Sequence, residues 1–405
     1  MQRVMTAEQP SFSPVDLGIY TGFATDTAGN QALIYERASG VVGMQRMSPR
    51  RPDPLETEVG ASYTKGEVNR AGRLLRHYSD IGVASDFDEA LATIGIEEVA
   101  DAFRAVIWCR SLHARPLTLV AAGLRCHVDE EHGGIDGHID VTQRLKRRST
   151  VINKLTREPT MEVAQMHDIG GVRARLPTTG HVYAVSRRLR ETWTIIRVRD
   201  YIAEPKSSGY RGLHVIVRRE GYPIEIQLRS VLQDAWANQV EEDGRTIGVG
   251  LKFGAGEADV HEYYRAVSEA FALMDRGEPL PDELVTAMNT RRSIIKDILP
   301  QNEDRQRHSA PQRVGEISMR PADIKHFLVI YNVKAGDAEV RPFGTDNDAA
   351  QLAYEEVEQE IGDRSDFDVV LLSSDSLQTI KRTHSSYFDT RESFAALLPA
   401  GVLRE

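Results

Sequence analysis

The chain has 405 residues, of which 50 are Lys or Arg and 60 are Asp or Glu, so its formal net charge is −10. This composition is typical of a globular protein of two or three domains, and it excludes collagen-like, mucin-like and fully disordered chains. The acidic balance argues against DNA binding that ignores sequence, because such binding needs an excess of basic residues. Two cysteines, Cys109 and Cys126, are too few for a disulfide framework or a zinc quartet.

The sequence also lacks the marks of a membrane or secreted protein. No apolar run reaches the roughly 20 residues that span a bilayer, and the N-terminus has no apolar core followed by a small-residue cleavage site. We therefore expect a cytoplasmic protein without a membrane partner.

Three parts of the chain are predicted before the motifs are considered. Residues 1–60 are expected to be a flexible N-terminal segment, because Gly, Pro, Ser and Thr are scattered through them. From Thr64 to about Arg125, apolar residues recur at helical spacing, and a second helical pattern covers residues 141–157. Runs of branched residues then predict strands alternating with helices, which favours a mixed sheet with helices packed on it. The expected strands are 169–176, 193–202, 212–219 and 222–229, and the expected helices are 181–191, 229–242 and the region 260–298.

The C-terminal part is expected to be a small α+β domain of unknown role, residues 323–405, behind a polar linker at 301–322. Its pattern predicts a hairpin, a helix, a strand and a last helix in the stretch SLQTIKRTHSSYF.

A basic stretch, RLKRRSTVINKLTR at 144–157, holds six basic residues and no acidic one. Arg144, Lys146 and Lys154 are spaced so that all three can approach one site from one side of a helix or its entry loop. Polyphosphate needs such a cluster, since Arg supplies a planar fork and Lys a point charge. The alternative is a solvated positive face on a surface helix.

Two carboxylates interrupt strand patterns. Asp168 opens one predicted strand and Glu225 lies within another. A carboxylate inside a strand needs a partner because burying it alone is costly. The pair suits a Mg²⁺ site for a bound triphosphate, and the alternative is two salt bridges, Asp168 with Arg173 and Glu225 with Arg229.

The loop 206–214 carries Lys206, Tyr210 and His214 around two glycines. The tyrosine ring suits stacking on a base, the lysine suits phosphate, and the histidine suits ribose or phosphate. The alternative is a β-turn whose Tyr and His pack on the sheet.

Together and in order, these pieces resemble the synthetase domain of the RelA/SpoT family. The family pattern Arg-x-Lys-x-x-x-Ser-Ile-x-x-Lys-Leu matches Arg144 to Leu155, and Asp-Ile-x-Gly-x-Arg matches Asp168 to Arg173. A third motif matches Asp200 through His214, and Glu-Ile-Gln-hydrophobic-Arg matches Glu225 to Arg229. The resemblance covers roughly residues 64–300 and is strongest over 140–240.

The resemblance implies an α+β fold: a nucleotidyltransferase-like mixed β-sheet flanked by helices, with a helical N-terminal part and the small C-terminal α+β domain. The synthetase domain would span 61–300, with a helical part at 61–137, a catalytic core at 138–245 and further helices at 246–300. The reaction implied is transfer of the β,γ-pyrophosphate of ATP to the 3′-OH of GDP or GTP, which makes the alarmone (p)ppGpp and releases AMP.

The resemblance also implies roles for single residues. Glu225 and Asp168 would bind Mg²⁺, and Glu225 would draw the proton from the 3′-OH. The ATP site would comprise Arg144 and Arg173 on the adenine and Lys146 and Lys154 on the phosphates. The acceptor nucleotide would be held by Lys206, Tyr210, His214, Gln227 and Arg229.

Thr150 and Val151 are conservative replacements of the Ser-Ile in the first motif, and the sequence departs from the family pattern more clearly at three further positions. Ser208 stands where the family has Asn, and Val240 and Glu241 stand where many members have Glu-His. The hydrolase domain and regulatory tail of the long family members are not recognisable. The resemblance also implies a homo-oligomer, since short relatives are often oligomeric.

Two other functions are kept beside the alarmone synthetase. One uses the same chemistry on the 3′ end of tRNA, as in toxin-like relatives, with the C-terminal domain as an attached antitoxin. It is motivated by the Arg-rich stretch 187–199 and by Ser208. The other is a non-catalytic nucleotide sensor that contacts a partner through its C-terminal domain.

Overall fold

The computed structural model describes the chain in two compact units. It describes residues 20–25, 31–36, 42–46, 63–84, 96–132, 140–247, 251, 256–295, 298, 313–314, 325–333, 335–361, 367–384, 387–388, 397–400 and 402–403. The first unit is formed within Met1–Ala114, Leu145–Ile169 and Asn347–Leu371, and the second within Arg115–Arg144, Gly170–Asp346 and Leu372–Glu405.

The first unit is mainly helical. It contains a three-stranded antiparallel sheet and several helices, of which α1, α3 and α5 pack around one apolar core. The strands are β1 Tyr20–Thr25, β2 Gln31–Glu36 and β3 Val42–Arg46. The helices are α1 Lys65–Ala84, α3 Ile96–Ser111, α5 Arg148–Arg157, the short 3-10 turn Val163–Gln165, and α11 Asn347–Ile361.

Helix α1 begins at a capping box that the sequence encodes directly. The hydroxyl of Thr64 accepts from the backbone N–H of Glu67 at 3.2 Å, and the Glu67 carboxylate accepts from the Thr64 N–H at 2.7 Å. Two of the otherwise unpaired N–H groups at the helix start are satisfied in this way.

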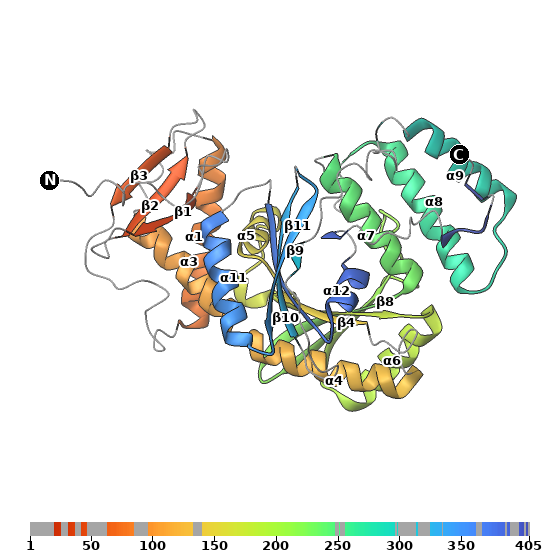
Figure 1. Ribbon diagram of the computed structural model, residues 1–405, viewed down its shortest axis with the longest axis horizontal. Helices are drawn as coiled ribbons and strands as arrows, with labels where there is room; N and C mark the ends of the chain where they lie inside the picture. The colour runs from red at the N-terminus through yellow and green to blue at the C-terminus, as the bar shows by residue number, and fades with distance from the viewer. Residues whose placement is uncertain are drawn as a thin grey trace. The chain divides into compact units, whose positions relative to one another are not determined.

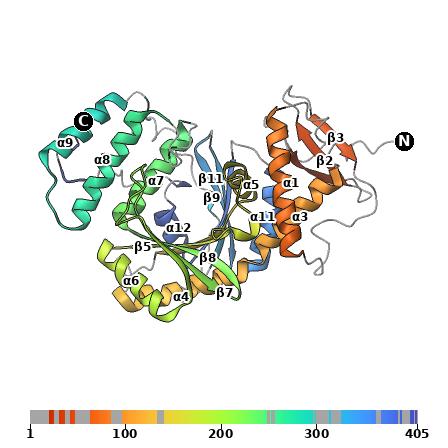
Figure 2. The same ribbon diagram turned by 180° about the vertical axis from the view of Figure 1, so that it is seen from behind.

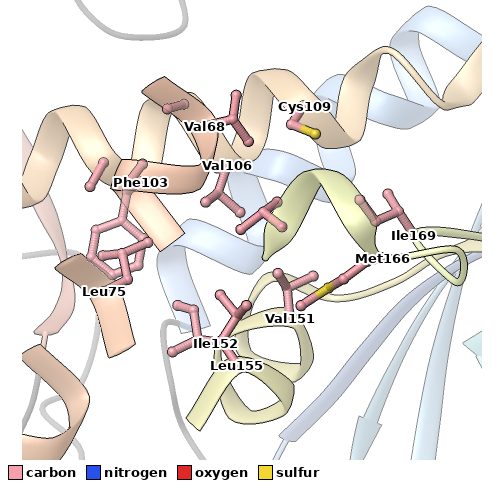
Figure 3. Packing of buried hydrophobic residues seen from close by; sticks show 14 of the residues in the cluster. Val68, Leu75, Phe103, Val106, Cys109, Val151, Ile152, Leu155, Met166 and Ile169 are labelled. Atoms are coloured by element: carbon pink, nitrogen blue, oxygen red, sulfur yellow. The ribbon is translucent and has the colours of Figure 1, made fainter. Parts of the chain in front are cut away.

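The core of the first unit joins α1, α3 and α5 to the segment that leads to Asp168. Figure 3 shows Leu75 and Phe103 from the helices facing Ile152 and Leu155 of α5. Met166 and Ile169, each 1% exposed, belong to the same cluster on either side of Asp168. The packing therefore holds both α5 and the segment around Asp168 in place.

Most strands of the second unit lie in one mixed sheet with the order β6-β7-β8-β5-β4-β12-β10-β11-β9 among the described residues. These strands are β4 Val141–Leu145, β5 Gly170–Leu176, β6 Ile195–Asp200, β7 Leu213–Arg219, β8 Tyr222–Ser230, β9 Arg313–Val314, β10 Lys325–Asn332, β11 Asp337–Gly344 and β12 Phe367–Ser374. β5 and β8 are parallel, whereas β6, β7 and β8 are antiparallel neighbours.

Helices cover both faces of this sheet. Helices α4 Ala114–His132 and α6 Thr179–Thr192 lie on one side, and α7 Val231–Thr246 and α12 Leu377–Thr383 lie on the other (Figures 1 and 2). Helices α8 Ala258–Asp275 and α9 Asp282–Ile295 extend the α7 side through a second apolar core around Trp236. No helix of the described residues is long and apolar enough to cross a membrane.

The predicted α+β class with a mixed sheet and flanking helices is confirmed. One expectation was wrong: residues 141–145 form strand β4, and only 148–157 of the expected helix 141–157 is helical. β4 is buried on both faces apart from Arg144, so it has no alternation that distinguishes so short a strand from a helical turn.

Two further expectations differ from the arrangement in the structure. Strands β1 to β3 lie within residues 1–60, where we expected a flexible segment, and the rest of that segment falls outside the described residues. The hairpin, helix, strand and last helix expected in 323–405 are present, but their strands extend the main sheet instead of forming a separate one. Most of the expected linker 301–322 is also outside the described residues, and its Arg313–Val314 pairs with β11.

Leu155 tests the core that holds α5. We expect Leu155→Ala to lower the free energy of unfolding by about 2–5 kcal/mol, because the side chain is fully buried and its removal leaves a cavity. Ile294→Ala is the control, since Ile294 is 49% exposed and should change stability by no more than about 0.5 kcal/mol. Urea denaturation of both variants measures the difference, and equal losses would contradict the packing described here.

Candidate functional site

In the first unit, two lysines converge on one carboxylate. Lys146 lies between β4 and α5, Lys154 lies in α5, and Asp168 follows the short 3-10 turn. The Lys146 Nζ is 2.9 Å from Asp168 Oδ2, and the Lys154 Nζ is 3.0 Å from both carboxylate oxygens. The structure thus gathers three of the predicted site residues at one point.

The charges of this triad determine its protonation. Burial raises the pKa of Asp168, but the ammonium groups of Lys146 and Lys154 outweigh that effect and lower it to about 2. Asp168 is therefore ionised at neutral pH. Two cations around one carboxylate leave a net positive charge, which suits a phosphate chain.

A buried ion pair fixes the loop that carries Lys146. Arg110 donates to the backbone oxygen of Lys146 at 2.9 Å and pairs with Glu358 of α11 at the same distance. The other Glu358 oxygen accepts from the backbone N–H of Arg148 at 2.8 Å, so a carboxylate lies at the first turn of α5. Burial raises the pKa of Glu358, and the two arginines lower it further than that, to below its ordinary value.

In the second unit, strand alternation places polar side chains on one face of the sheet. On β8, Ile224, Ile226 and Leu228 are fully buried, whereas Glu225 and Gln227 alternate with them and are partly exposed. The register aligns His214 of β7 with Gln227, and Gln227 with Arg173 of β5. Residues from three strands therefore form one row across the sheet.

Five of the predicted residues close a ring of hydrogen bonds. The Tyr210 hydroxyl lies 2.6 Å from His214 Nε2, and His214 Nδ1 lies 3.0 Å from a Glu225 oxygen. Gln227 donates to the other Glu225 oxygen at 2.9 Å. Arg229 donates to Gln227 at 3.1 Å and to the Tyr210 hydroxyl at 3.2 Å. We call this set the polar ring.

The polar ring shifts the pKa values of two of its members. Burial raises the pKa of Tyr210, but Arg229 and His214 outweigh it and lower the pKa to about 8. Burial lowers the pKa of His214, and Tyr210 and Glu225 raise it above its ordinary value. The ring thus makes Tyr210 easier to ionise and makes His214 keep its proton to a higher pH.

The loop before β7 holds Tyr210 in place. Gly209 has φ of +91°, and a Cβ there would meet the Cα of Arg265 at 3.1 Å, so only glycine fits without strain. The Lys206 ammonium lies over the rings of Tyr201 and Tyr210, 4.5 and 5.0 Å from their centroids. In this state Lys206 lies over the ring that was predicted to stack on a base.

Asp234 is a site residue that the sequence analysis did not assign. Its carboxylate, 1% exposed, accepts from Arg229 at 3.0 Å and lies 3.8 Å from Arg173. Asn238, one turn further along α7, donates to Asp234 at 3.1 Å and accepts from Arg173 at 3.4 Å. The sequence signal that could have identified Asp234 is its position, five residues after Arg229 and in the first turn of a helix.

The departures from the family pattern have local explanations in the structure. The Ser208 hydroxyl accepts from the backbone N–H of Tyr210 at 3.4 Å, so it supports the turn. Val240 is 4% exposed in the apolar core with Trp236, whereas Glu241 acts electrostatically on Arg173.

The structure does not test the predicted metal site. Asp168 belongs to the first unit and Glu225 to the second. No group of three or more His, Cys, Asp or Glu among the described residues is arranged to hold a metal ion. The salt bridges considered as alternatives would pair Asp168 with Arg173 and Glu225 with Arg229. The contacts found are Asp168 with two lysines, and Glu225 with His214 and Gln227.

Residues 143–244 match the family model described as "Region found in RelA / SpoT proteins". Among curated proteins, the chain is similar to the GTP pyrophosphokinase YwaC of Bacillus subtilis, 36% identical over 129 residues. It is also similar to the GTP pyrophosphokinase YjbM of the same organism, 32% identical over 124 residues. Each match covers 27% of this chain, and it spans 61% and 56% of the two relatives, less than two thirds of either.

Among solved structures, the chain resembles small alarmone synthetase 1 from Bacillus subtilis bound to its product pppGpp. The identity is 25% and the TM-score 0.35, with 42% of this chain and 93% of the other covered.

The shifted Tyr210 pKa is directly measurable. We expect one tyrosine of the wild-type protein to ionise near pH 8, below the ordinary pKa of 10.0. This ionisation step should be absent from the Tyr210→Phe variant. A pKa that folding lowers stabilises the folded protein increasingly as the pH rises through that value. The phenolate signal in ultraviolet difference spectra of the two proteins measures the shift. Identical titrations would contradict the polar ring.

Proposed function

We propose that this chain, whose residues 143–244 match the RelA/SpoT family model, transfers the β,γ-pyrophosphate of ATP to the 3′-OH of GDP or GTP. The products would be the alarmone (p)ppGpp and AMP. The observation that carries the proposal is that residues matching four ordered motifs lie in two sets, the lysine–carboxylate triad and the polar ring. The similarity to two GTP pyrophosphokinases supports it.

The donor nucleotide is assigned to the cationic residues. Lys146 and Lys154 would exchange part of their contact with Asp168 for contacts with the phosphate oxygens of ATP. The two ammonium groups and the single carboxylate together carry a net positive charge, which attracts phosphate. Arg144 and Arg173 would flank the adenine with their guanidinium planes. Transfer of this kind depends mainly on positioning and charge neutralisation, so fixed cations supply much of the catalysis.

The acceptor nucleotide is assigned to the polar ring and its loop. Tyr210 would stack on guanine after Lys206 leaves its ring, and Lys206 would then contact phosphate. Glu225 would accept the proton of the 3′-OH. His214 and Gln227 hold its two oxygens, so the carboxylate is oriented before the substrate arrives.

Magnesium is the metal that this proposal implies. Carboxylate oxygens are ligands that this hard cation accepts, and Asp168 is ionised at neutral pH. When bound, Mg²⁺ would neutralise charge on the phosphate oxygens. Asp168 and Glu225 are the residues proposed to hold it together with the nucleotide.

The acceptor is tested by product analysis. We expect purified protein with labelled ATP and Mg²⁺ to pyrophosphorylate GDP or GTP and to release AMP. Glu225→Gln should lower kcat by about 10² to 10⁴ because the proton acceptor is lost. Glu283→Gln, at an exposed position of α9, is the matched control and should be as active as the wild type. Label found on bulk tRNA alone would instead favour the toxin-like reaction, and absence of transfer to any acceptor would favour a sensor.

Asp234 provides a second test, through the arginines it contacts. We expect Asp234→Asn to raise the KM for both nucleotides by about tenfold or more, because a charged hydrogen bond that orients Arg229 is lost. Steady-state kinetics measures the effect, with Asp282→Asn at the exposed start of α9 as the control. Unchanged KM values in a folded Asp234→Asn protein would show that the arginines do not need this carboxylate.

A further inference from the structure

The end of α12 occupies a place beside a predicted ATP-binding arginine. Arg173 donates to the backbone oxygen of Thr383, the last residue of α12, at 2.8 Å. Carbonyl groups at a helix C-terminus carry partial negative charge, so they suit a guanidinium partner. A segment from the far end of the chain thus takes a hydrogen bond that Arg173 would otherwise direct elsewhere.

The next residue, His384, is buried among the same cations. It is 4% exposed. Burial and the charges of Arg173, Arg144 and Arg229 lower its pKa well below its ordinary value, so it is neutral. Its ring stacks on that of Tyr387 with an interplanar angle of 17°. A neutral, planar, nitrogen-containing ring beside the two arginines is chemically similar to the adenine that the proposed function assigns to them.

The arginines themselves indicate that this place suits an anion or a polar base. Burial and the charge of Arg229 lower the pKa of Arg173 to about 10, and Arg144 adds to the effect, although Asp234 opposes it. Like charges held together in a buried region cost free energy unless a ligand compensates. In this structure the Thr383 carbonyl supplies part of that compensation.

Ionic contacts hold the segment on the sheet. The Arg382 Nε donates to Asp140 at 3.0 Å, and the Asp140 side chain is fully buried. Arg125 donates to Ser374 at 3.1 Å and lies 3.5 Å from Asp375. The Ser376 hydroxyl caps α12 by accepting from the Thr379 N–H at 3.1 Å. Figure 1 shows α12 between α7 and β8.

We propose that α12 and His384 form an autoinhibitory plug that occupies the adenine position beside Arg173, so that ATP binds only after the plug leaves. The inference rests on the proposed function, because that function assigns Arg144 and Arg173 to adenine. It gives the C-terminal residues a regulatory role. The Arg382–Asp140 contact is the latch of this plug, and its loss raises the fraction of molecules with an open donor site.

The latch is tested by ATP affinity in the full-length protein. We expect Arg382→Ala and His384→Gly each to tighten binding of a non-transferable ATP analogue, measured by calorimetry, by about tenfold, because apparent affinity scales with the open fraction. Gln378→Ala changes an exposed residue of the same helix and should bind like the wild type. Affinities equal to that of the wild type in both plug variants would overturn the proposal.

Hydrogen exchange of the unmutated protein gives an independent test that does not depend on a variant folding. The His384 N–H donates to the Ile380 oxygen at 2.8 Å, so release of the plug exposes it. We expect saturating ATP analogue to increase exchange over residues 377–384. Decreased or unchanged exchange would mean that the segment is part of the binding site or remains in place, and either result excludes a plug.

The two proposals fail in different assays. If the plug variants bind ATP more tightly but the protein makes no product with any acceptor, the proposed function is wrong and the plug proposal stands. If the wild-type protein transfers pyrophosphate and the plug variants bind ATP with the same affinity as the wild type, the proposed function stands and the plug proposal is wrong.

Discussion

A carboxylate in the middle of a sheet must find hydrogen-bond donors, and Glu225 finds them in the polar ring. His214 and Gln227 each donate to one of its oxygens, and Arg229 ties Gln227 to Tyr210. The ring is possible because β7 and β8 are antiparallel neighbours whose register sets His214 opposite Gln227. Without these partners, burying the carboxylate in the strand would cost free energy.

Buried charges connect the ring to the rest of the second unit. Asp234 contacts Arg229 and approaches Arg173, so one helix side chain influences residues assigned to both nucleotides. Removing the Asp234 carboxylate would leave the buried charges of Arg229 and Arg173 less compensated, which makes such a network sensitive to this substitution. The same reasoning explains why the backbone oxygen of Thr383 is a favourable partner for Arg173.

Residues from the C-terminal part of the chain make contacts within both units. Glu358 of α11 contacts the start of α5 in the first unit, and α12 contacts Arg173 in the second. Strands β10 to β12 extend the main sheet, so these residues are integral to the fold. The contact of α12 with Arg173 is the one through which the proposed regulation by the C-terminal residues would act.

The sequence by itself determined the α+β class, the strands and helices of residues 169–242, and the residues that gather at the triad and the polar ring. It did so because alternation and helical spacing are local, because Glu225 lies within an otherwise apolar strand pattern, and because ordered motifs resemble those of the RelA/SpoT synthetase domain. Only the tertiary structure decided the rest. Strand β4 is short and is buried on both faces except at Arg144, so its sequence shows no alternation of apolar and polar residues. The pairs Arg110–Glu358, Arg382–Asp140 and Arg173–Thr383 join residues more than 200 positions apart. No local pattern encodes such pairs, since they form only when packing brings distant charges together.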